Sequence, residues 1–136
     1  MPELKRIETV VFLQSVDIFT DCKAEEVLRV AAITHERTFE AGADIYSPGD
    51  PADALFCIVR GEVRLVSDDE TEVVGPLRTF GATGLLTGRR RRAAAVADSD
   101  TLVLMIDDED FFDLLAHNIE IVRALFRTLL PTGERQ

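Results

Sequence analysis

The chain has 136 residues, of which 46% are hydrophobic and 29% are charged, and its formal net charge is −10. This length is typical of one domain with a sizeable core, and no apolar run approaches the roughly 18 residues that a membrane span needs. The negative charge disfavours nucleic acid as a partner, because phosphate backbones require a broad basic face. Since the N-terminus has no signal-peptide pattern, the sequence predicts one cytoplasmic globular domain.

Two helical patterns open the chain. An apolar stripe beginning at Leu4 predicts a short helix, followed by an extended stretch at 16–19. A clearer pattern lies at 24–33, where apolar residues recur at the spacing of one buried helix face. Asp21 is the best candidate for the N-cap of this second helix. Helices are therefore expected within residues 4–33.

The region 35–106 alternates short apolar runs with turns rich in Gly, Pro and Asp. Short strands at close spacing are typical of an antiparallel β-barrel or sandwich. The main expected strands lie at 55–59, 62–66, 71–74, 93–97 and 101–106. Gly61 interrupts a longer strand pattern, which indicates a bulge or a tight bend.

Residues 108–130 carry the pattern of a C-terminal helix. The acidic run 107–110 would suit a divalent metal, but we interpret it as the helix cap and first turn, where acids complement the helix dipole. Ile106 and Phe111 flank this cap at the spacing of a hydrophobic staple. The pair at 117–118 indicates a kink or split. The elements together predict an α+β domain with an antiparallel β core flanked by helices.

The cysteines and histidines do not form a catalytic or metal-binding pattern. Cys22 and Cys57 lie inside apolar runs and are expected to be buried, reduced thiols, since no metal-type spacing exists. No Ser/His/Asp or Cys/His set with a convincing set of partners is visible. The sequence therefore predicts neither an enzyme nor a metal site.

The most distinctive segment is FGATGLLTGRRRRAAAV at 80–96. Four of the fifteen basic residues of this acidic chain are consecutive there, after a glycine-led turn. Two interpretations stand. The arginines hold a small anion, or they form an exposed basic loop that offsets neighbouring acids or binds an acidic partner.

Three motifs resemble the cyclic nucleotide-binding domain family. The pattern F-x-x-G-x-x-I at 39–45 resembles the family's first turn, the segment 49–63 its central hairpin, and 75–81 the start of its phosphate-binding cassette. The resemblance covers about residues 5 to 130 and implies a β-roll of the jelly-roll-like, double-stranded β-helix type. The expected division of this single domain, 1–136, is helices at 4–33, the β-roll at 35–106 and the C-terminal helix at 108–130.

The resemblance also implies a ligand site. Arg91 would pair with the phosphate of a cyclic nucleotide, cAMP or cGMP, because a guanidinium forks onto phosphate oxygens. Backbone N–H groups of the short helical turn at 81–85 would add hydrogen bonds. The expected ligand-binding residues are Phe80, Gly81, Ala82, Thr83, Gly84, Leu85, Arg91, Arg92 and Ala93.

Three positions depart from the family's cassette. Ala82 stands where the family has a Glu that would accept a hydrogen bond from the ribose 2′-hydroxyl. A hydrogen bond of this kind is worth about 1.5–3 kcal/mol, or roughly 10- to 150-fold in affinity. Arg90 stands where the family often has Pro, and Gly84 where Ala is usual; both changes predict a softer loop.

These observations lead to two hypotheses. The first is a regulatory or sensor domain that binds a cyclic nucleotide or a related small phosphate anion weakly, with the C-terminal helix responding to capture. The alternative is a degenerate, non-binding domain that acts as a protein-interaction or dimerisation module through that helix. Because only six residues follow Leu130, no DNA-binding helix-turn-helix is expected after the sensor.

Overall fold

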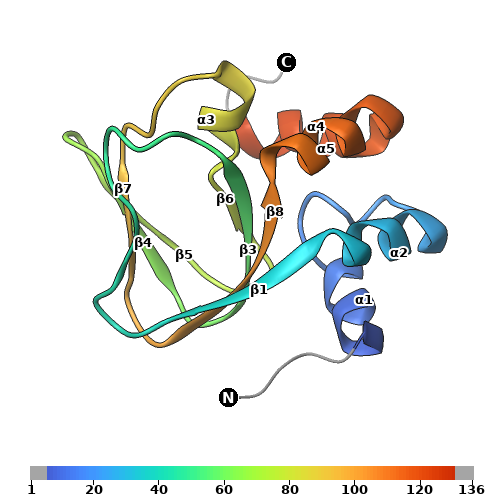
Figure 1. Ribbon diagram of the computed structural model, residues 1–136, viewed down its shortest axis with the longest axis horizontal. Coiled ribbons are helices and arrows are strands. Elements are labelled where there is room, and N and C mark those ends of the chain that lie inside the picture. The colour runs from blue at the N-terminus through green and yellow to red at the C-terminus, as the bar shows by residue number, and fades with distance from the viewer. Residues whose placement is uncertain (1–5, 131–136) are drawn as a thin grey trace.

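A computed structural model describes residues 6–130 of the chain. An antiparallel β-roll occupies one side of the molecule, and helices α1, α2, α4 and α5 lie along the other (Figure 1). The α+β class predicted from the sequence is confirmed, as is the flanking of a β-roll by helices.

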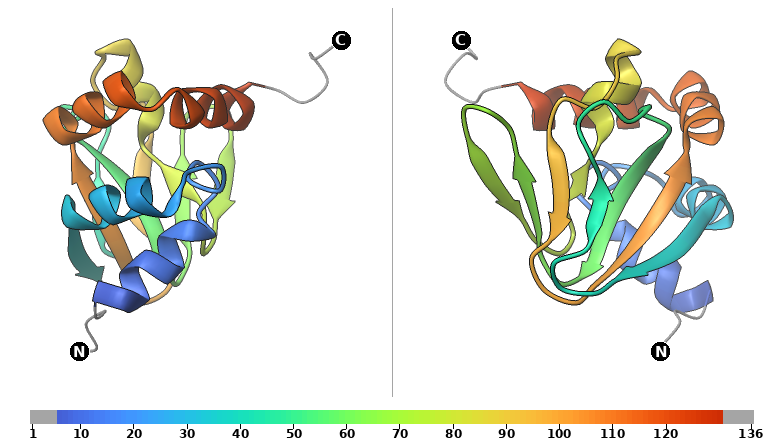
Figure 2. Two further views of the ribbon diagram at one scale, coloured as in Figure 1. Left: turned by 90° about the vertical axis from the view of Figure 1, so that its right-hand side faces the viewer. Right: turned by 60° about the vertical axis from the view of Figure 1, so that its left-hand side comes forward.

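Two four-stranded antiparallel sheets form the roll (Figures 1 and 2). The first has the strand order β1-β8-β3-β6 and the second β2-β7-β4-β5. The strands of the first sheet are β1 (Thr34–Phe39), β3 (Ala54–Arg60), β6 (Thr79–Phe80) and β8 (Thr101–Asp107). The strands of the second are β2 (Asp44–Tyr46), β4 (Val63–Val66), β5 (Thr71–Val74) and β7 (Ala94–Ala97). The expected strands are found within one or two residues of their predicted ends.

The helices are α1 (Arg6–Gln14), α2 (Ala24–Ala32), α3 (Ala82–Thr87), α4 (Asp108–His117) and α5 (Ile119–Leu129). Helix α3 lies at one end of the roll, beside the C-terminal helices (Figure 1), and its residues Ala82 and Leu85 belong to the same core as Leu125 of α5. Within residues 6–130, no helix has the length and apolar character to cross a membrane.

The C-terminal helix expected at 108–130 is two helices, which corrects its extent. Asn118 separates α4 from α5 with an extended backbone, φ −142° and ψ 93°. Its buried amide nitrogen donates to the Leu114 carbonyl at 2.9 Å, so the side chain satisfies an acceptor that the ended helix leaves open. The break indicated at 117–118 is therefore present.

The strand β3 is buried along most of its length because both of its faces are covered. Leu55 and Cys57 belong to the core between the first sheet and the helices. Phe56 and Ile58, which alternate with them, belong to the core inside the roll. β3 is therefore the element that the two cores share. Each fully buried side chain of this size stabilises the fold by about 1.5–3 kcal/mol.

The segment before α2 differs from its prediction in two ways. Residues 16–19 form turns rather than an extended piece, with the Phe19 N–H donating to the Val16 carbonyl at 2.9 Å. The N-cap of α2 is Lys23, not Asp21, and the Glu26 carboxylate accepts from the Lys23 N–H at 2.8 Å. Asp21 instead pairs with Arg127 of α5 at 2.7 Å. Leu4 lies outside the described residues.

The acidic run before α4 acts as a helix start. Asp107 is the N-cap residue, although its side chain makes no capping hydrogen bond, and the Asp108 carboxylate accepts from the Glu109 N–H at 2.8 Å. Residues 6–130 contain no group of three or more His, Cys, Asp or Glu side chains that could hold a metal ion.

Both cysteines are free thiols. Cys57 is buried as predicted, whereas Cys22 is only partly buried. Burial raises the pKa of the Cys57 thiol above its ordinary value. Burial, helped by the charges of Glu26, Glu120 and Asp21, raises the pKa of Cys22 to about 11. Both thiols therefore stay protonated and weakly nucleophilic at neutral pH.

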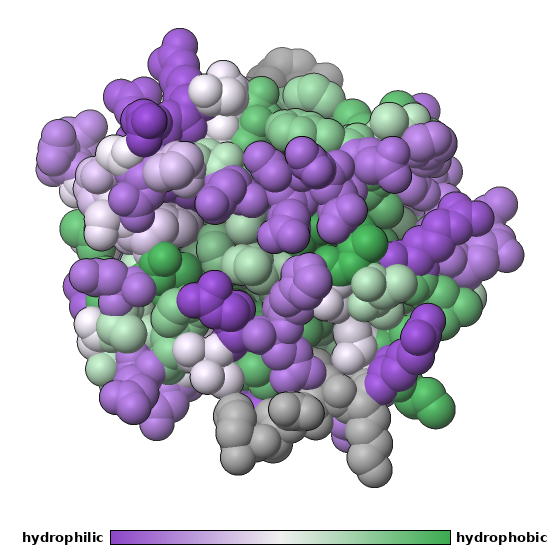
Figure 3. All heavy atoms as spheres, in the orientation of Figure 1, coloured by the Kyte–Doolittle hydropathy of each residue, from purple (hydrophilic) through white to green (hydrophobic). Residues whose placement is uncertain are grey.

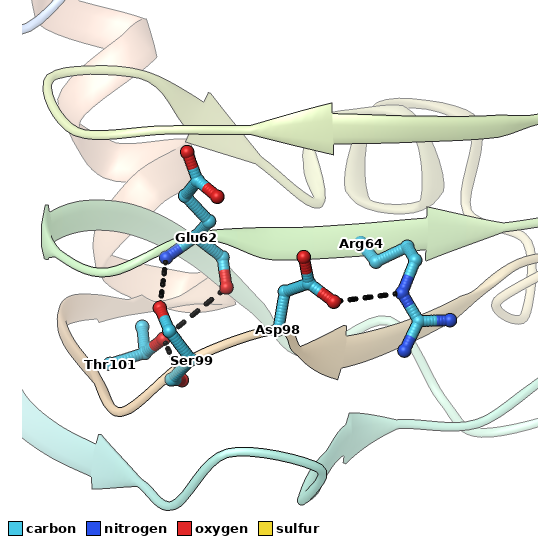
Figure 4. Close-up of polar contacts among 5 residues, drawn as sticks. All are labelled: Glu62, Arg64, Asp98, Ser99 and Thr101. Atoms are coloured by element: carbon cyan, nitrogen blue, oxygen red, sulfur yellow. Dashed lines mark hydrogen bonds and ion pairs between the residues drawn. The ribbon is translucent and has the colours of Figure 1, made fainter.

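The bend expected at Gly61 joins β3 to β4. Gly61 has a φ of +92°, and the register of β3 against β8 shifts between Ile58 and Arg60. The adjoining turns are tied together by Glu62, whose N–H donates to the Ser99 hydroxyl at 3.1 Å (Figure 4). A Cβ at Gly61 would lie 2.5 Å from the Asp100 carbonyl oxygen, so the turn leaves no room for a side chain.

We predict that Gly61→Ala lowers the free energy of unfolding by about 2–3 kcal/mol, because it adds a clash to a left-handed backbone. Urea unfolding followed by circular dichroism measures this. Gly75→Ala is the matched control, since its Cβ would meet nothing within 4 Å and its φ is not positive; it should change stability by less than about 0.5 kcal/mol. Equal effects at the two glycines would contradict the steric explanation.

Candidate anion-binding site

A cleft of about 240 Å³ lies beside α3 and the segment that leads to β7. Its lining residues are Tyr46, Leu65, Gly81, Thr83, Gly84, Thr87, Arg89, Arg90, Arg91, Arg92 and Ala93. The lining includes four arginines and no carboxylate. Strongly hydrophilic side chains gather at the upper left of Figure 3, over this end of the roll. The cleft therefore presents concentrated positive charge on a chain whose net charge is −10.

Six of the nine expected ligand-binding residues line this cleft, namely Gly81, Thr83, Gly84, Arg91, Arg92 and Ala93. The other three, Phe80, Ala82 and Leu85, are buried, each with 4% of its surface exposed. Their side chains belong to the hydrophobic cores, so these three positions hold the cassette in place rather than facing the cleft.

The Arg91 side chain is buried, with 6% of its surface exposed. Its Nη1 donates to the Gly81 carbonyl and its Nη2 to the Ala54 carbonyl, both at 2.7 Å. Its Nε is buried without a hydrogen-bond partner. Among residues 6–130, no carboxylate forms an ion pair with it within 4.0 Å. A guanidinium has five N–H donors, so Arg91 keeps N–H donors that are not used by the hydrogen bonds found among residues 6–130.

An aromatic side chain covers the Arg91 guanidinium. Its Cζ lies 4.2 Å from the centroid of the Tyr46 ring, within the range of a cation–π contact. Tyr46 packs in turn against Phe56 and Phe80, at centroid distances of 6.0 and 6.2 Å. Burial raises the pKa of Tyr46, and the Arg91 charge opposes that rise. The second sheet thus contributes the face of a neutral ring to a site whose other residues come mainly from α3 and the arginine segment.

Backbone hydrogen bonds fix the arginine segment to the turn that follows β2. The Arg91 N–H donates to the Asp50 carbonyl, and the Arg91 carbonyl accepts from the Gly49 N–H, both at 2.8 Å. The Arg90 side chain donates to the Gly49 carbonyl at 2.9 Å. Arg90, which replaces the family's frequent Pro, therefore adds an anchor between the two segments.

The side chains of Arg89 and Arg92 are exposed at the cleft. Neither has a hydrogen bond or ion pair to another side chain or to the backbone in the part of the chain that the structure describes. Of the four consecutive arginines, one is buried, one is held by Gly49 and two remain available at the rim. The four arginines thus differ in burial and partners, and the two interpretations of the run stay open.

Two glycines permit the short helix α3 to approach the barrel. Gly81 has a φ of +95°, and a Cβ there would lie 3.2 Å from the Arg91 Nη1. At Gly84 a Cβ would lie 2.7 Å from the Cβ of Ala52, closer than side chains approach. The sequence treats Gly84 as a weakness of the helix, but the structure shows that it makes room for Ala52.

A second cavity, about 310 Å³ in volume, connects the cassette to α5. Leu65, Gly81 and Thr83 line both this cavity and the cleft, and Leu125 and Leu129 of α5 line its other side. The cavity therefore lies between the cassette and α5, and three residues of its lining also line the cleft.

Sequence reasoning missed several parts of the site. Tyr46, Arg89, Thr87 and Leu65 line the cleft but are not among the ligand-binding residues expected from the sequence. The carbonyl of Ala54 carries no side-chain signal at all, since backbone acceptors look alike in every sequence. For Tyr46, the one available signal was its position directly before the Ser-Pro-Gly-Asp turn.

Comparisons with known proteins identify the family of this chain. The sequence profile of the cyclic nucleotide-binding domain matches residues 36–118, so the chain belongs to that family. It is 28% identical over 116 residues to a cyclic nucleotide-gated potassium channel of Mesorhizobium japonicum, covering 85% of this chain and 32% of the channel. It is 30% identical over 119 residues to the cyclic AMP receptor protein of Thermus thermophilus, covering 79% and 55%. The chain thus spans between about a third and about half of these relatives.

Solved structures share the fold. The regulatory subunit of a cAMP-independent protein kinase A from Trypanosoma brucei, a mutant bound to cAMP in the A site, superposes with a TM-score of 0.84 at 22% identity, covering 94% of this chain and 48% of that one. The sensor domain of a transcriptional regulator from Pseudomonas aeruginosa gives 0.79 at 19% identity, covering 91% and 87%.

We predict that Gly84→Ala destabilises the protein by about 1–3 kcal/mol through overpacking against Ala52, although Ala is favoured over Gly in a helix by about 1 kcal/mol. Urea unfolding of Gly84→Ala, Ala52→Gly and the double variant forms a double-mutant cycle. The double variant should lose less free energy of unfolding than the sum of the losses in the two single variants. Additive effects, or a stabilising Gly84→Ala, would show that the contact does not constrain α3.

Proposed function

We propose that this is a regulatory domain that captures a cyclic nucleotide, or a related small phosphate compound, in the cleft at Arg91. The supporting observation is a buried guanidinium that has no carboxylate partner among residues 6–130. Removing a charge from water costs several kcal/mol unless an opposite charge or hydrogen bonds compensate for it. Two carbonyls and one aromatic face compensate in part, and a bound anion would complete the neutralisation.

The family relatives give the ligand class of the proposal. Their names describe a cyclic nucleotide-gated channel, a cyclic AMP receptor protein and a cAMP-dependent protein kinase regulatory subunit. Each of those names belongs to a longer protein, so we carry over only the capture of a phosphate-bearing ligand by the shared domain. As in those regulatory proteins, we expect the domain to transmit binding rather than to catalyse a reaction. A cytoplasmic location stays a prediction.

We expect cyclic nucleotides to bind weakly. The side chain of Ala82 is buried and apolar, and the cleft lining contains no carboxylate to accept from a ribose 2′-hydroxyl. The loss of roughly 10- to 150-fold in affinity takes a micromolar site to a dissociation constant on the order of tens to hundreds of micromolar. Binding at this level would still allow regulation where the ligand is abundant.

Helix α5 is the element proposed to respond. Ile121 and Leu125 are buried in the core that α5 shares with the first sheet, and Leu125 also lines the cavity next to Gly81. Val122 and Phe126 complete the surface that we propose as the relay, and Phe126 is 61% exposed. A ligand that shifts α3 would therefore alter the packing of α5.

Titration calorimetry with cAMP and cGMP, each to millimolar concentration, tests this function. Heat of binding is expected for at least one of them, and Arg91→Lys should weaken it by about tenfold or more, because lysine lacks the fork that binds two phosphate oxygens. Arg29→Gln is the matched control, since Arg29 is exposed on α2 and does not line the cleft. Circular dichroism confirms that the variants are folded.

Absence of heat with every cyclic nucleotide would reject the nucleotide version of the proposal. Equal affinities of the wild type and Arg91→Lys would place binding elsewhere.

A second function is favoured by a separate observation. The end of α5 exposes Phe126, Leu129 and Leu130, with 61%, 44% and 51% of their surfaces accessible. Exposed apolar groups of this kind mark interaction surfaces when they are contiguous. In the alternative function, the domain acts as an interaction or dimerisation module through α5, and the cleft stays empty.

Light scattering on the isolated chain separates the two functions. The module predicts a dimer that dissociates when Phe126→Ser is introduced and that is unaffected by Arg91→Lys. A monomer at all concentrations, together with Arg91-dependent ligand binding, would exclude the homodimer form of this alternative.

A further inference from the structure

The charges that line the cleft exceed what a cyclic nucleotide needs. A cyclic phosphodiester carries one negative charge, whereas a phosphomonoester carries about −1.5 to −2 at pH 7. The lining contributes four guanidinium groups and no carboxylate. The buried Arg91 alone matches the single charge of a cyclic phosphate. The remaining cationic groups must therefore be explained separately.

Arg89 and Arg92 are the groups left over. Arg90 donates to the Gly49 carbonyl at 2.9 Å, but Arg89 and Arg92 have no such partner within the described residues. Both line the same cleft as Arg91. Arginine binds phosphate oxygens through paired N–H donors. Arg89 and Arg92 could therefore bind further phosphate oxygens of a ligand whose first two oxygens are bound by Arg91.

The carboxylates near Arg91 lie on its other side. Asp50, Asp53 and Asp107 line a separate cavity of about 280 Å³, which shares only Tyr46 and Arg91 with the cleft. Charges on exposed groups are screened over about 8 Å at physiological ionic strength. Salt therefore weakens the repulsion between an anion in the cleft and the distant acidic groups of a chain whose net charge is −10, and the lining itself contains no carboxylate to oppose the arginines.

We infer that the cleft selects small ligands whose phosphate group carries two or more negative charges, a phosphomonoester or a diphosphate, over cyclic phosphodiesters. This deepens the proposed function and rests on it, since it concerns the same cleft and the same Arg91. Within residues 6–130, the observation behind it is a buried arginine without an ion pair beside two arginine side chains without a hydrogen bond or ion pair, in a lining that has no carboxylate.

Calorimetric titration with adenosine 5′-monophosphate, adenosine 5′-diphosphate, cAMP and adenosine, at pH 7.5 and 150 mM salt, tests the inference. AMP and ADP are expected to bind about tenfold or more tightly than cAMP, a difference of about 1.4 kcal/mol, and adenosine should give no heat. In the double variant Arg89→Gln/Arg92→Gln, the ratio of AMP to cAMP affinity should fall to within about threefold of one.

Arg6→Gln/Arg29→Gln is the matched control, because it removes the same charge from exposed positions on α1 and α2. It should leave the ratio unchanged. Equal or tighter binding of cAMP overturns the inference while the proposed function stands. A preference for AMP over cAMP that persists in Arg89→Gln/Arg92→Gln also overturns the inference and leaves the proposed function standing. If no phosphate compound binds, or if Arg91→Lys binds all of them as the wild type does, the proposed function itself fails.

Discussion

The burial of one guanidinium without a counter-charge is the constraint on which this site depends. Arg91 contacts the carbonyl of Ala54 at the start of β3, the carbonyl of Gly81 before α3 and the ring of Tyr46 at the end of β2. These partners come from both sheets and from three distant segments. The charge therefore positions the cassette against the roll, and the roll in turn fixes where the charge lies. A site of this kind is organised before any ligand arrives, which lowers the entropic cost of binding.

Further hydrogen bonds hold the centre of the arginine segment against the turn that follows β2. The backbone of Arg91 is paired with Gly49 and Asp50, and Arg90 adds a further bond to Gly49. The side chains of Arg89 and Arg92, on either side of Arg90 and Arg91, have no hydrogen bond or ion pair among residues 6–130. The segment therefore combines a rigid centre with adaptable edges. Rigid groups set the geometry of recognition, whereas long exposed side chains contribute mainly charge.

The sequence predicts those features that are recorded in local chemistry, and it misses those that arise from distant segments. Turn residues mark the strands, and the resemblance to the family's cassette points to Arg91 among four consecutive arginines. The sequence indicates the break at Asn118 as a kink or split. It predicts Asp21 as the N-cap of α2, because Lys23 is recognisable as the cap only through its hydrogen bond with Glu26. The need for Gly84 depends on Ala52, 32 positions earlier in the sequence, and no periodicity reports such a contact. Propensity alone therefore gives the wrong sign for that glycine.

One substitution changes two properties of the site at once. The resemblance to the family implies a Glu at position 82, and a carboxylate there would supply both an acceptor for a ribose hydroxyl and a negative charge beside the phosphate. In the proposed function, Ala82 provides neither the acceptor, which would weaken recognition of a cyclic nucleotide, nor the negative charge that would oppose the arginines of the cleft. The first effect lowers affinity for one ligand class, and the second raises the electrostatic attraction for every anion. The same alanine at position 82 is therefore compatible with a cassette that has lost its ligand and with one that binds a more highly charged ligand. The two possibilities differ in whether Arg89 and Arg92 contribute to binding.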